Sequence, residues 1–202
     1  MKYLYPCILS LLVLFLPAWC QAQDSHTTDT NRPWYYPDHA VLQFAGNIGF
    51  LAAGPGYSFN RDRMDAELLY GYTPGYDTNT GVHIITAKWS YRPFRMNLKN
   101  GFLLEPLKLG TGISYSVGPQ FHTTWPGRYP DGYYWWTSSF RLTPFIGPTI
   151  SRKVGHENTL IKRVQLYGEL GTNDLALVSF IGNKKLGLIE ILNIALGTRL
   201  VF

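Results

Sequence analysis

Residues 107–117 show the clearest alternation of apolar and polar side chains in the chain. One set is Leu107, Leu109, Thr111, Ile113, Tyr115 and Val117, and the other is Lys108, Gly110, Gly112, Ser114 and Ser116. A helix would scatter these residues around its axis, whereas a strand sorts them onto two faces. The period of two therefore predicts a strand, and a strand of about 9–11 residues is long enough to cross a bilayer at a tilt.

The same period recurs through most of the chain after residue 40. We expect strands in segments 64–72, 82–92, 136–150, 160–170 and 192–202. The glycine-rich stretch 40–60 fits one bent strand or two. Two strands there would bring the total to eight, an even number, as bacterial single-chain membrane barrels have. The fold class predicted is all-β, an antiparallel up-and-down transmembrane barrel.

The connections between these strands can be assigned to the two ends of such a barrel. Residues 60–62, 93–101 and 151–159 fall at the end that holds Phe202, and residues 74–80, 118–135 and 172–186 at the other. The longest connections then lie at the same end, as the long extracellular loops of membrane barrels do. We expect Leu109, Ile113, Leu196 and Leu200 to face lipid, and Lys108, Ser114 and Arg199 to face the barrel interior.

The N-terminus has the layout of a secretory signal peptide. Lys2 precedes an apolar run over 8–19, and Cys20-Gln21-Ala22 leads into a polar stretch. The run is short for a membrane-spanning helix. We therefore predict a signal peptide at 1–22, an extended lead-in at 23–39 and the barrel at 40–202. A retained anchor and lipidation at Cys20 are the alternatives. Cleavage after Ala22 would leave no cysteine for a disulfide, zinc cluster or nucleophile.

The composition supports a membrane barrel more than a bundle of membrane helices. Charged residues make up 15% of the chain and aromatic residues another 15%, and glycine occurs 20 times. Mean hydropathy is near neutral, at -0.08. The net charge of +5 comes from scattered basic residues without a recognition motif, so we expect no nucleic-acid partner.

The last predicted strand carries a more specific pattern. Its apolar residues are Leu192, Ile194, Leu196, Leu200 and Phe202, with Thr198 as an interruption. This resembles the final strand of bacterial outer-membrane β-barrel proteins, which ends in an aromatic residue, usually Phe. The resemblance implies an outer-membrane location in a Gram-negative cell envelope, contact with outer-membrane lipid, and recognition of this strand by the barrel-assembly machinery. A soluble lipocalin-like barrel remains the alternative, because a period of two does not say which face is inside.

The segment from Glu169 to Asp174 gathers polar residues at the expected outer rim. Within it, Leu170-Gly171-Thr172-Asn173 resembles the His-x-Ser-Asn element of the outer-membrane lipid A deacylases, which implies a base and a nucleophile at its first and third positions. Leu170 cannot accept a proton, so the resemblance implies a barrel without that chemistry. We take Glu169, Thr172, Asn173 and Asp174 as candidate binding residues. The alternative is a turn whose side chains bond nearby backbone.

An aromatic loop supplies a second set of candidates, His122, Trp125 and Arg128. Aromatic platforms beside an arginine suit glycans or lipid headgroups, whereas residues 133–136 fit a girdle at the membrane interface. The five histidines show no metal-ligand spacing, and no phosphate loop or serine elbow occurs, so we predict neither metal nor cofactor. We favour a structural, binding or accessory role without a catalytic site. A lipid-modifying hydrolase at the rim is the alternative.

Overall fold

The computed structural model describes residues 33–202, apart from 34, 76–80, 118–138, 156–158 and 184–185. The predicted signal peptide and most of the lead-in lie outside these residues, as do His122, Trp125 and Arg128. None of the helices in the described ranges is long and apolar enough to cross a membrane.

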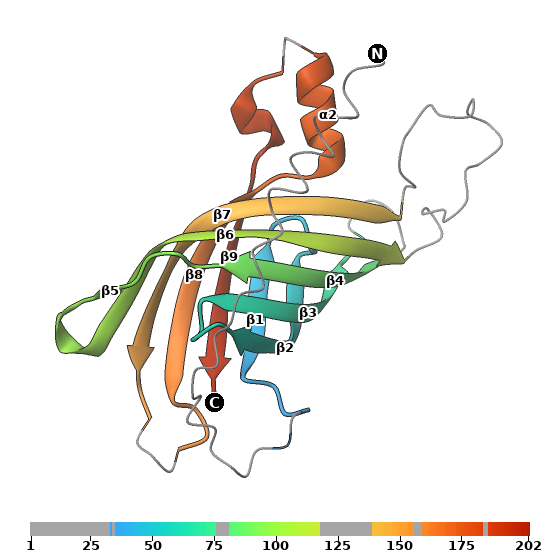
Figure 1. Ribbon diagram of the computed structural model, residues 1–202. Helices are drawn as coiled ribbons and strands as arrows, with labels where there is room; N and C mark the ends of the chain where they lie inside the picture. Colours follow the sequence, from blue (N-terminus) through green and yellow to red (C-terminus); the bar gives the residue numbers. More distant parts are fainter. Residues whose placement is uncertain (1–32, 34, 76–80, 118–138, 156–158, 184–185) are drawn as a thin grey trace. The chain divides into compact units, whose positions relative to one another are not determined.

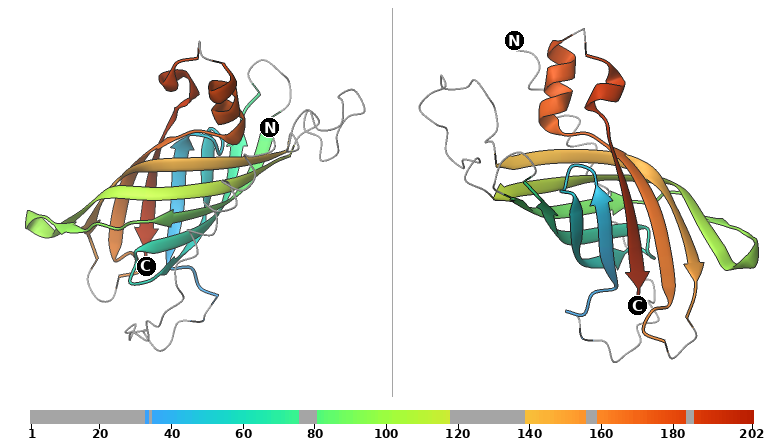
Figure 2. Two further views of the ribbon diagram at one scale, coloured as in Figure 1. Left: turned by 45° about the horizontal axis from the view of Figure 1, so that its top comes forward. Right: turned by 180° about the vertical axis from the view of Figure 1, so that it is seen from behind.

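Eight antiparallel strands close into a barrel (Figure 1). They are β1 (His39–Ala45), β2 (Leu51–Phe59), β3 (Met64–Thr73), β4 (Val82–Tyr91), β6 (Phe102–Val117), β7 (Phe140–Lys153), β8 (Arg163–Gly171) and β9 (Asn193–Val201). Neighbours in sequence pair with one another, and the pairing of β1 with β9 closes the wall, as the rear view in Figure 2 shows. The prediction of eight strands, two of them within 40–60, is confirmed.

The strands β6 and β7 extend beyond their predicted bounds. Strand β6 begins at Phe102, and the two-residue strand β5 (Met96–Asn97) pairs with it to form a hairpin that also includes the 3-10 helix η1 (Lys99–Gly101). The register of β6 against β7 shifts between Glu105 and Lys108. This bulge turns both side chains to the inner face although they are three residues apart.

The link after β8 is helical, whereas the sequence also allowed a simple turn at residues 172–174. It contains helix α2 (Asp174–Gly182) and the 3-10 helix η2 (Leu188–Ile191). The side chain of Asn173 accepts a hydrogen bond from the amide of Ala176 at 2.8 Å and so caps the helix. Asp174 in the first turn adds a negative charge where the helix dipole favours one.

Neighbouring strands of the barrel lie very close together at two glycines. A Cβ atom at Gly54 would lie 1.9 Å from the carbonyl oxygen of Leu68, and one at Gly147 would lie 1.9 Å from that of Gly168. Neighbouring strands could not keep this separation with any larger residue. Gly54 and Gly147 therefore permit the close approach of β2 to β3 and of β7 to β8.

Candidate functional site

The inner face of the barrel is charged. Among the described residues, four carboxylate side chains and four lysine or arginine side chains are at most 5% exposed: Asp65, Glu67, Glu105, Glu169, Lys88, Arg92, Lys108 and Arg199. They come from β3, β4 and its end, β6, β8 and β9. The predicted inward direction of Lys108, Ser114 and Arg199 is confirmed. On the opposite face Leu109, Ile113 and Leu196 are exposed, whereas Leu200 is half-buried.

Arg199 is the centre of one group of these charges. Its Nη1 donates to Asp65 Oδ2 at 2.7 Å, and its Nη2 lies 2.5 Å from Glu67 Oε1. Asp65 also accepts a hydrogen bond from Arg92 Nη2 at 2.9 Å. Arg92 Nε in turn lies 3.5 Å from Glu105 Oε1. The group therefore ties β9 to the adjacent strands β3, β4 and β6, none of which pairs with β9 in the sheet.

Glu169 is the centre of a second group nearer to α2. Its Oε1 accepts from Lys88 Nζ at 2.7 Å and from Lys108 Nζ at 2.5 Å. The ammonium of Lys108 also lies 3.6 Å from the ring centroid of Tyr167, a cation–π arrangement. Lys88 Nζ joins the two groups, since it is 4.0 Å from Glu67 Oε2.

The two groups form one buried network of equal numbers of opposite charges. Burying a charge is costly unless a partner and hydrogen bonds compensate it, and here every one of the eight side chains has an oppositely charged neighbour within 4.0 Å. An eight-stranded barrel has an interior just wide enough for side chains. The network crosses that space from one side of the wall to the other, so the geometry suits a barrel closed to solutes better than a solute pore.

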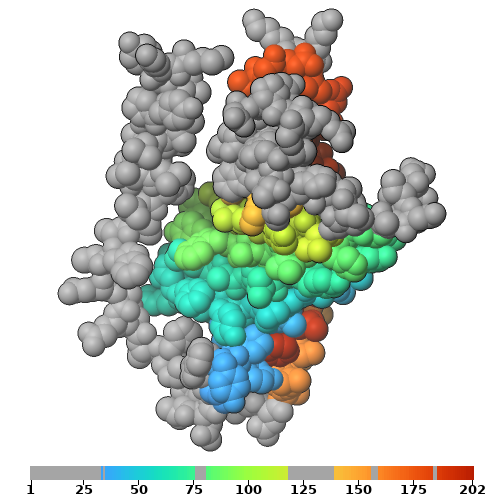
Figure 3. Space-filling view, turned by 90° about the vertical axis from the view of Figure 1, so that its right-hand side faces the viewer, coloured from blue at the N-terminus to red at the C-terminus, as the bar shows by residue number. Residues whose placement is uncertain are grey.

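The outer face is apolar on every strand. Large apolar side chains that are at least 36% exposed occur on all eight: Leu42, Phe44, Leu51, Phe59, Leu68, Tyr70, Tyr72, Ile85, Trp89, Tyr91, Leu109, Ile113, Val117, Phe140, Ile146, Ile150, Leu166, Leu170, Ile194 and Leu196. Outward positions of β3 and β9 carry no charged residue. Figure 3 shows the face of the wall that includes the teal and green strands β3, β4 and β6.

Aromatic residues gather toward both ends of this outer face. The end that holds Phe202, here called the Phe202 rim, has exposed Phe59, Trp89, Tyr91 and Phe94. The opposite end, here called the α2 rim, has exposed Phe44, Phe50, Tyr70, Tyr72 and Phe140. Aliphatic residues such as Leu68, Ile113, Leu166 and Leu196 lie on the strands between. Two aromatic rows around an aliphatic band are typical of membrane barrels.

The four candidate residues at the α2 rim occupy different environments. Glu169 points into the barrel and binds the two lysines, and Asn173 caps α2 and contacts Asn47 Oδ1 at 3.5 Å. Thr172 is buried, and its hydroxyl has no hydrogen-bond partner in the described part of the chain. Asp174 Oδ1 lies 4.0 Å from Arg141 Nε. The structure therefore shows no base in contact with Thr172 among the residues it describes.

The interior network contains residues that the sequence did not single out as a site. The inward direction of Arg92 could have been predicted by extending the alternation of Thr86, Lys88 and Ser90 by two residues. The inward direction of Glu105 could not have been predicted, because strict alternation from Lys108 would place Glu105 on the outer face and the bulge in β6 turns it inward. Within the described ranges, no group of three or more His, Cys, Asp or Glu residues could hold a metal ion.

Comparison with known protein families, with curated proteins and with solved structures finds no match.

Proposed function

We propose that this chain is a bacterial outer-membrane β-barrel with a closed interior, serving as a structural, binding or accessory component of that membrane. The observation that carries the proposal is the inverted polarity of the wall, whose outer face is apolar on all eight strands and whose inner face buries charges from β3, β4, β6, β8 and β9. A soluble lipocalin-like barrel encloses its ligand in a cavity and turns its outer face to water. Apolar side chains on the outside are stable where the surrounding solvent is lipid.

The two aromatic rows support the same location, since Trp and Tyr favour the headgroup level on both sides of a bilayer. In this orientation the Phe202 rim faces the periplasm and the α2 rim faces outward. The barrel-assembly machinery would bind β9, which ends beside Phe202, and outer-membrane lipid would surround the wall. A role without catalysis is favoured by the setting of Thr172, which no described base contacts.

Cell fractionation tests the location. The protein should pellet with outer membranes, resist extraction by sodium carbonate at high pH, and dissolve in detergent, because the apolar outer face would otherwise meet water. A soluble periplasmic protein followed through the same steps is the control. Recovery of the chain with that soluble protein would refute the membrane location and favour the lipocalin-like alternative.

Lipid mass spectrometry tests the absence of catalysis at the rim. Membranes from cells with the protein, without it, and with Thr172→Ala should have the same acyl-chain pattern. Thr111→Ala, at an exposed position on the outer face of β6, is the matched control. An acyl-chain change that requires the protein and disappears with Thr172→Ala but not with Thr111→Ala would establish the hydrolase instead.

A further inference from the structure

A polar pocket of about 490 Å³ opens at the Phe202 rim. Its volume is within the range of roughly 300–1,000 Å³ that is usual for small-ligand sites. Charged and polar side chains from opposite parts of the wall line it, among them His39, Asp65, Arg92, Lys153, Lys162 and Arg163. The pocket is at the opposite end of the barrel from the Glu169–Asp174 segment.

The acidic groups of the pocket are already engaged by the protein. Asp65 binds Arg92 and Arg199, at 2.9 and 2.7 Å. Asp38 Oδ2 accepts a hydrogen bond from the amide of Ser58 at 2.8 Å. Asp62, whose side chain is 43% exposed, lies 3.9 Å from Arg163 Nη1. Asp65 is thereby neutralised by two arginines, and none of the three aspartates forms an ion pair with Lys153 or Lys162 among the described residues.

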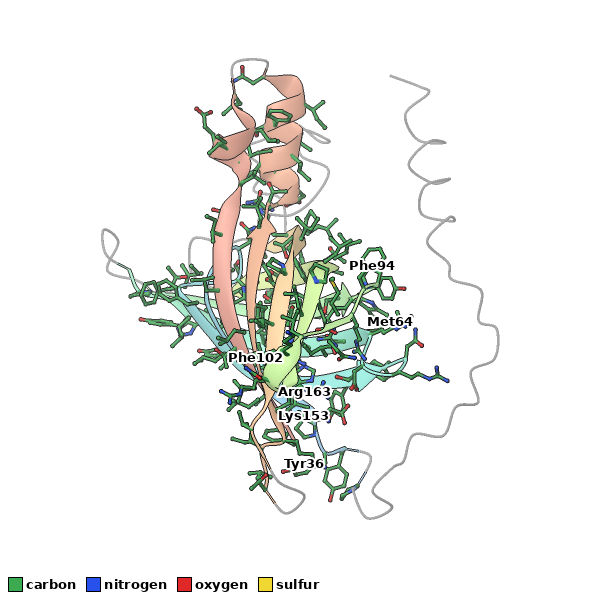
Figure 4. All side chains as sticks on the ribbon, turned by 90° about the vertical axis from the view of Figure 1, so that its left-hand side faces the viewer. Tyr36, Met64, Phe94, Phe102, Lys153 and Arg163 are labelled. Atoms are coloured by element: carbon green, nitrogen blue, oxygen red, sulfur yellow. The ribbon has the colours of Figure 1, made fainter. Side chains whose placement is uncertain are left out.

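The β7–β8 side of the pocket carries an excess of positive charge. Lys153 and Arg163 are directly paired across the ladder of β7 and β8, and Lys162 precedes Arg163. Figure 4 shows Lys153 and Arg163 side by side at this end of the barrel. Like charges directly opposite each other on paired strands destabilise a sheet. In the part of the chain that the structure describes, neither Lys153 nor Lys162 has an ion-pair partner.

A further cation faces the same space from deeper in the barrel. Arg92 lines the pocket and is 1% exposed. Its Nη1 donates to Gln165 Oε1 at 3.3 Å, and its Nη2 donates to Asp65 Oδ1 at 2.9 Å and to the carbonyl oxygen of Asp62. Arg92 is therefore held in place by the protein and adds a fixed positive charge to those of Lys153, Lys162 and Arg163, and this charge favours an anion in the space between them.

We propose that the pocket binds a phosphate group, carried either by a phospholipid headgroup or by a soluble phosphate compound. The two lysines supply mobile point charges, Arg163 supplies a planar guanidinium that matches phosphate oxygens, and Arg92 contributes a fixed positive charge. An anion there would relieve the repulsion between Lys153 and Arg163 and stabilise the β7–β8 hairpin. The site does not rest on the membrane location, because the pocket belongs to the barrel whatever surrounds its outer face.

The test uses the full mature chain in micelles of an uncharged detergent, titrated with inorganic pyrophosphate by calorimetry at constant ionic strength. Replacing both lysines (Lys153→Gln with Lys162→Gln) should weaken binding by about tenfold or more, since two charged contacts are lost. Lys99→Gln is the matched control, because Lys99 is an exposed lysine of the β5–β6 hairpin. It should change binding by less than about twofold.

A second arm distinguishes the source of the phosphate. The protein is equilibrated in phosphatidylcholine micelles containing some phosphatidylglycerol, and the lipid retained is counted by native mass spectrometry. Pyrophosphate binding without retained phosphatidylglycerol indicates a soluble ligand, and retention that the double variant loses indicates a headgroup. The proposal is overturned if the wild-type chain takes neither ligand, or if Lys99→Gln weakens binding as much as the double variant. Because the pyrophosphate arm needs no membrane, its result is independent of the fractionation result.

Discussion

Lys88 and Trp89 are neighbours in β4, yet they lie on opposite sides of the barrel wall. Lys88 is 4% exposed and its ammonium contacts Glu169, Gln43 and Glu67, whereas Trp89 is 51% exposed on the outer face. An ordinary soluble protein would bury the tryptophan and expose the lysine. The outer side of the wall is therefore apolar and its inner side carries charges that neutralise one another, and the proposed membrane location rests on this contrast.

The two sides also differ in how their stability is distributed. Inside, each charge depends on partners from strands far away in the sequence, so removing one leaves another buried and unpaired. Outside, each apolar side chain contributes to stability separately, in proportion to the apolar area that is kept away from water. Single substitutions should therefore have a larger effect inside the barrel, and the effect outside should depend on what surrounds the wall.

The largest effect is expected for Arg199→Met. This substitution removes the cation between Asp65 and Glu67 and should lower the free energy of unfolding by about 3–5 kcal/mol. Urea unfolding of the protein refolded in phospholipid vesicles measures it. Arg63→Met, in the exposed link between β2 and β3, is the control and should cost less than about 0.5 kcal/mol. Equal losses for the two variants would show that the interior network contributes little.

An intermediate effect is expected for Ile113→Arg on the outer face of β6. If lipid surrounds this position, the arginine should cost about 2–4 kcal/mol in the same vesicles. If water surrounds it, the cost should stay within about 0.5 kcal/mol, as at other exposed sites. Asn97→Arg, on the exposed hairpin strand β5, introduces the same side chain at the edge of the wall. Similar stabilities for Ile113→Arg and Asn97→Arg would contradict the proposed lipid environment of the outer face.

The smallest effect is expected at the α2 rim, which belongs to neither face. Asn173→Ala removes the side-chain cap of α2 and should destabilise that helix by about 1 kcal/mol. Hydrogen exchange should speed up for the α2 amides and stay unchanged in the strands. Asn193→Ala serves as the control, because it loses a bond to Asn47 without removing the cap. Faster exchange throughout the barrel would mean that the rim helix supports the wall.

The candidate site was less predictable than the strands. Glu169 was recognised as a rim residue, but its binding to Lys88 and Lys108 joins residues 81 and 61 positions apart. The role of Asn173 could have been found from its place before an acidic residue and an apolar run, which is a helix-start signal. The cations of the Phe202-rim pocket appear in the sequence only as two scattered basic pairs, Arg152-Lys153 and Lys162-Arg163. Strand pairing brings Lys153 and Arg163 together.

The strand segments and the two sets of alternating side chains follow from the sequence alone, because a period of two is a local property of extended backbone. The alternation already places Asp65 and Glu67 on one face of their strand, and Lys88 and Ser90 on one face of theirs. Which charges meet depends on the tertiary fold, because those contacts require the closure of the barrel through the β1–β9 and β4–β6 pairs. The β6 bulge was likewise decided by pairing with β7, since a one-residue shift of register reverses the faces of a strand.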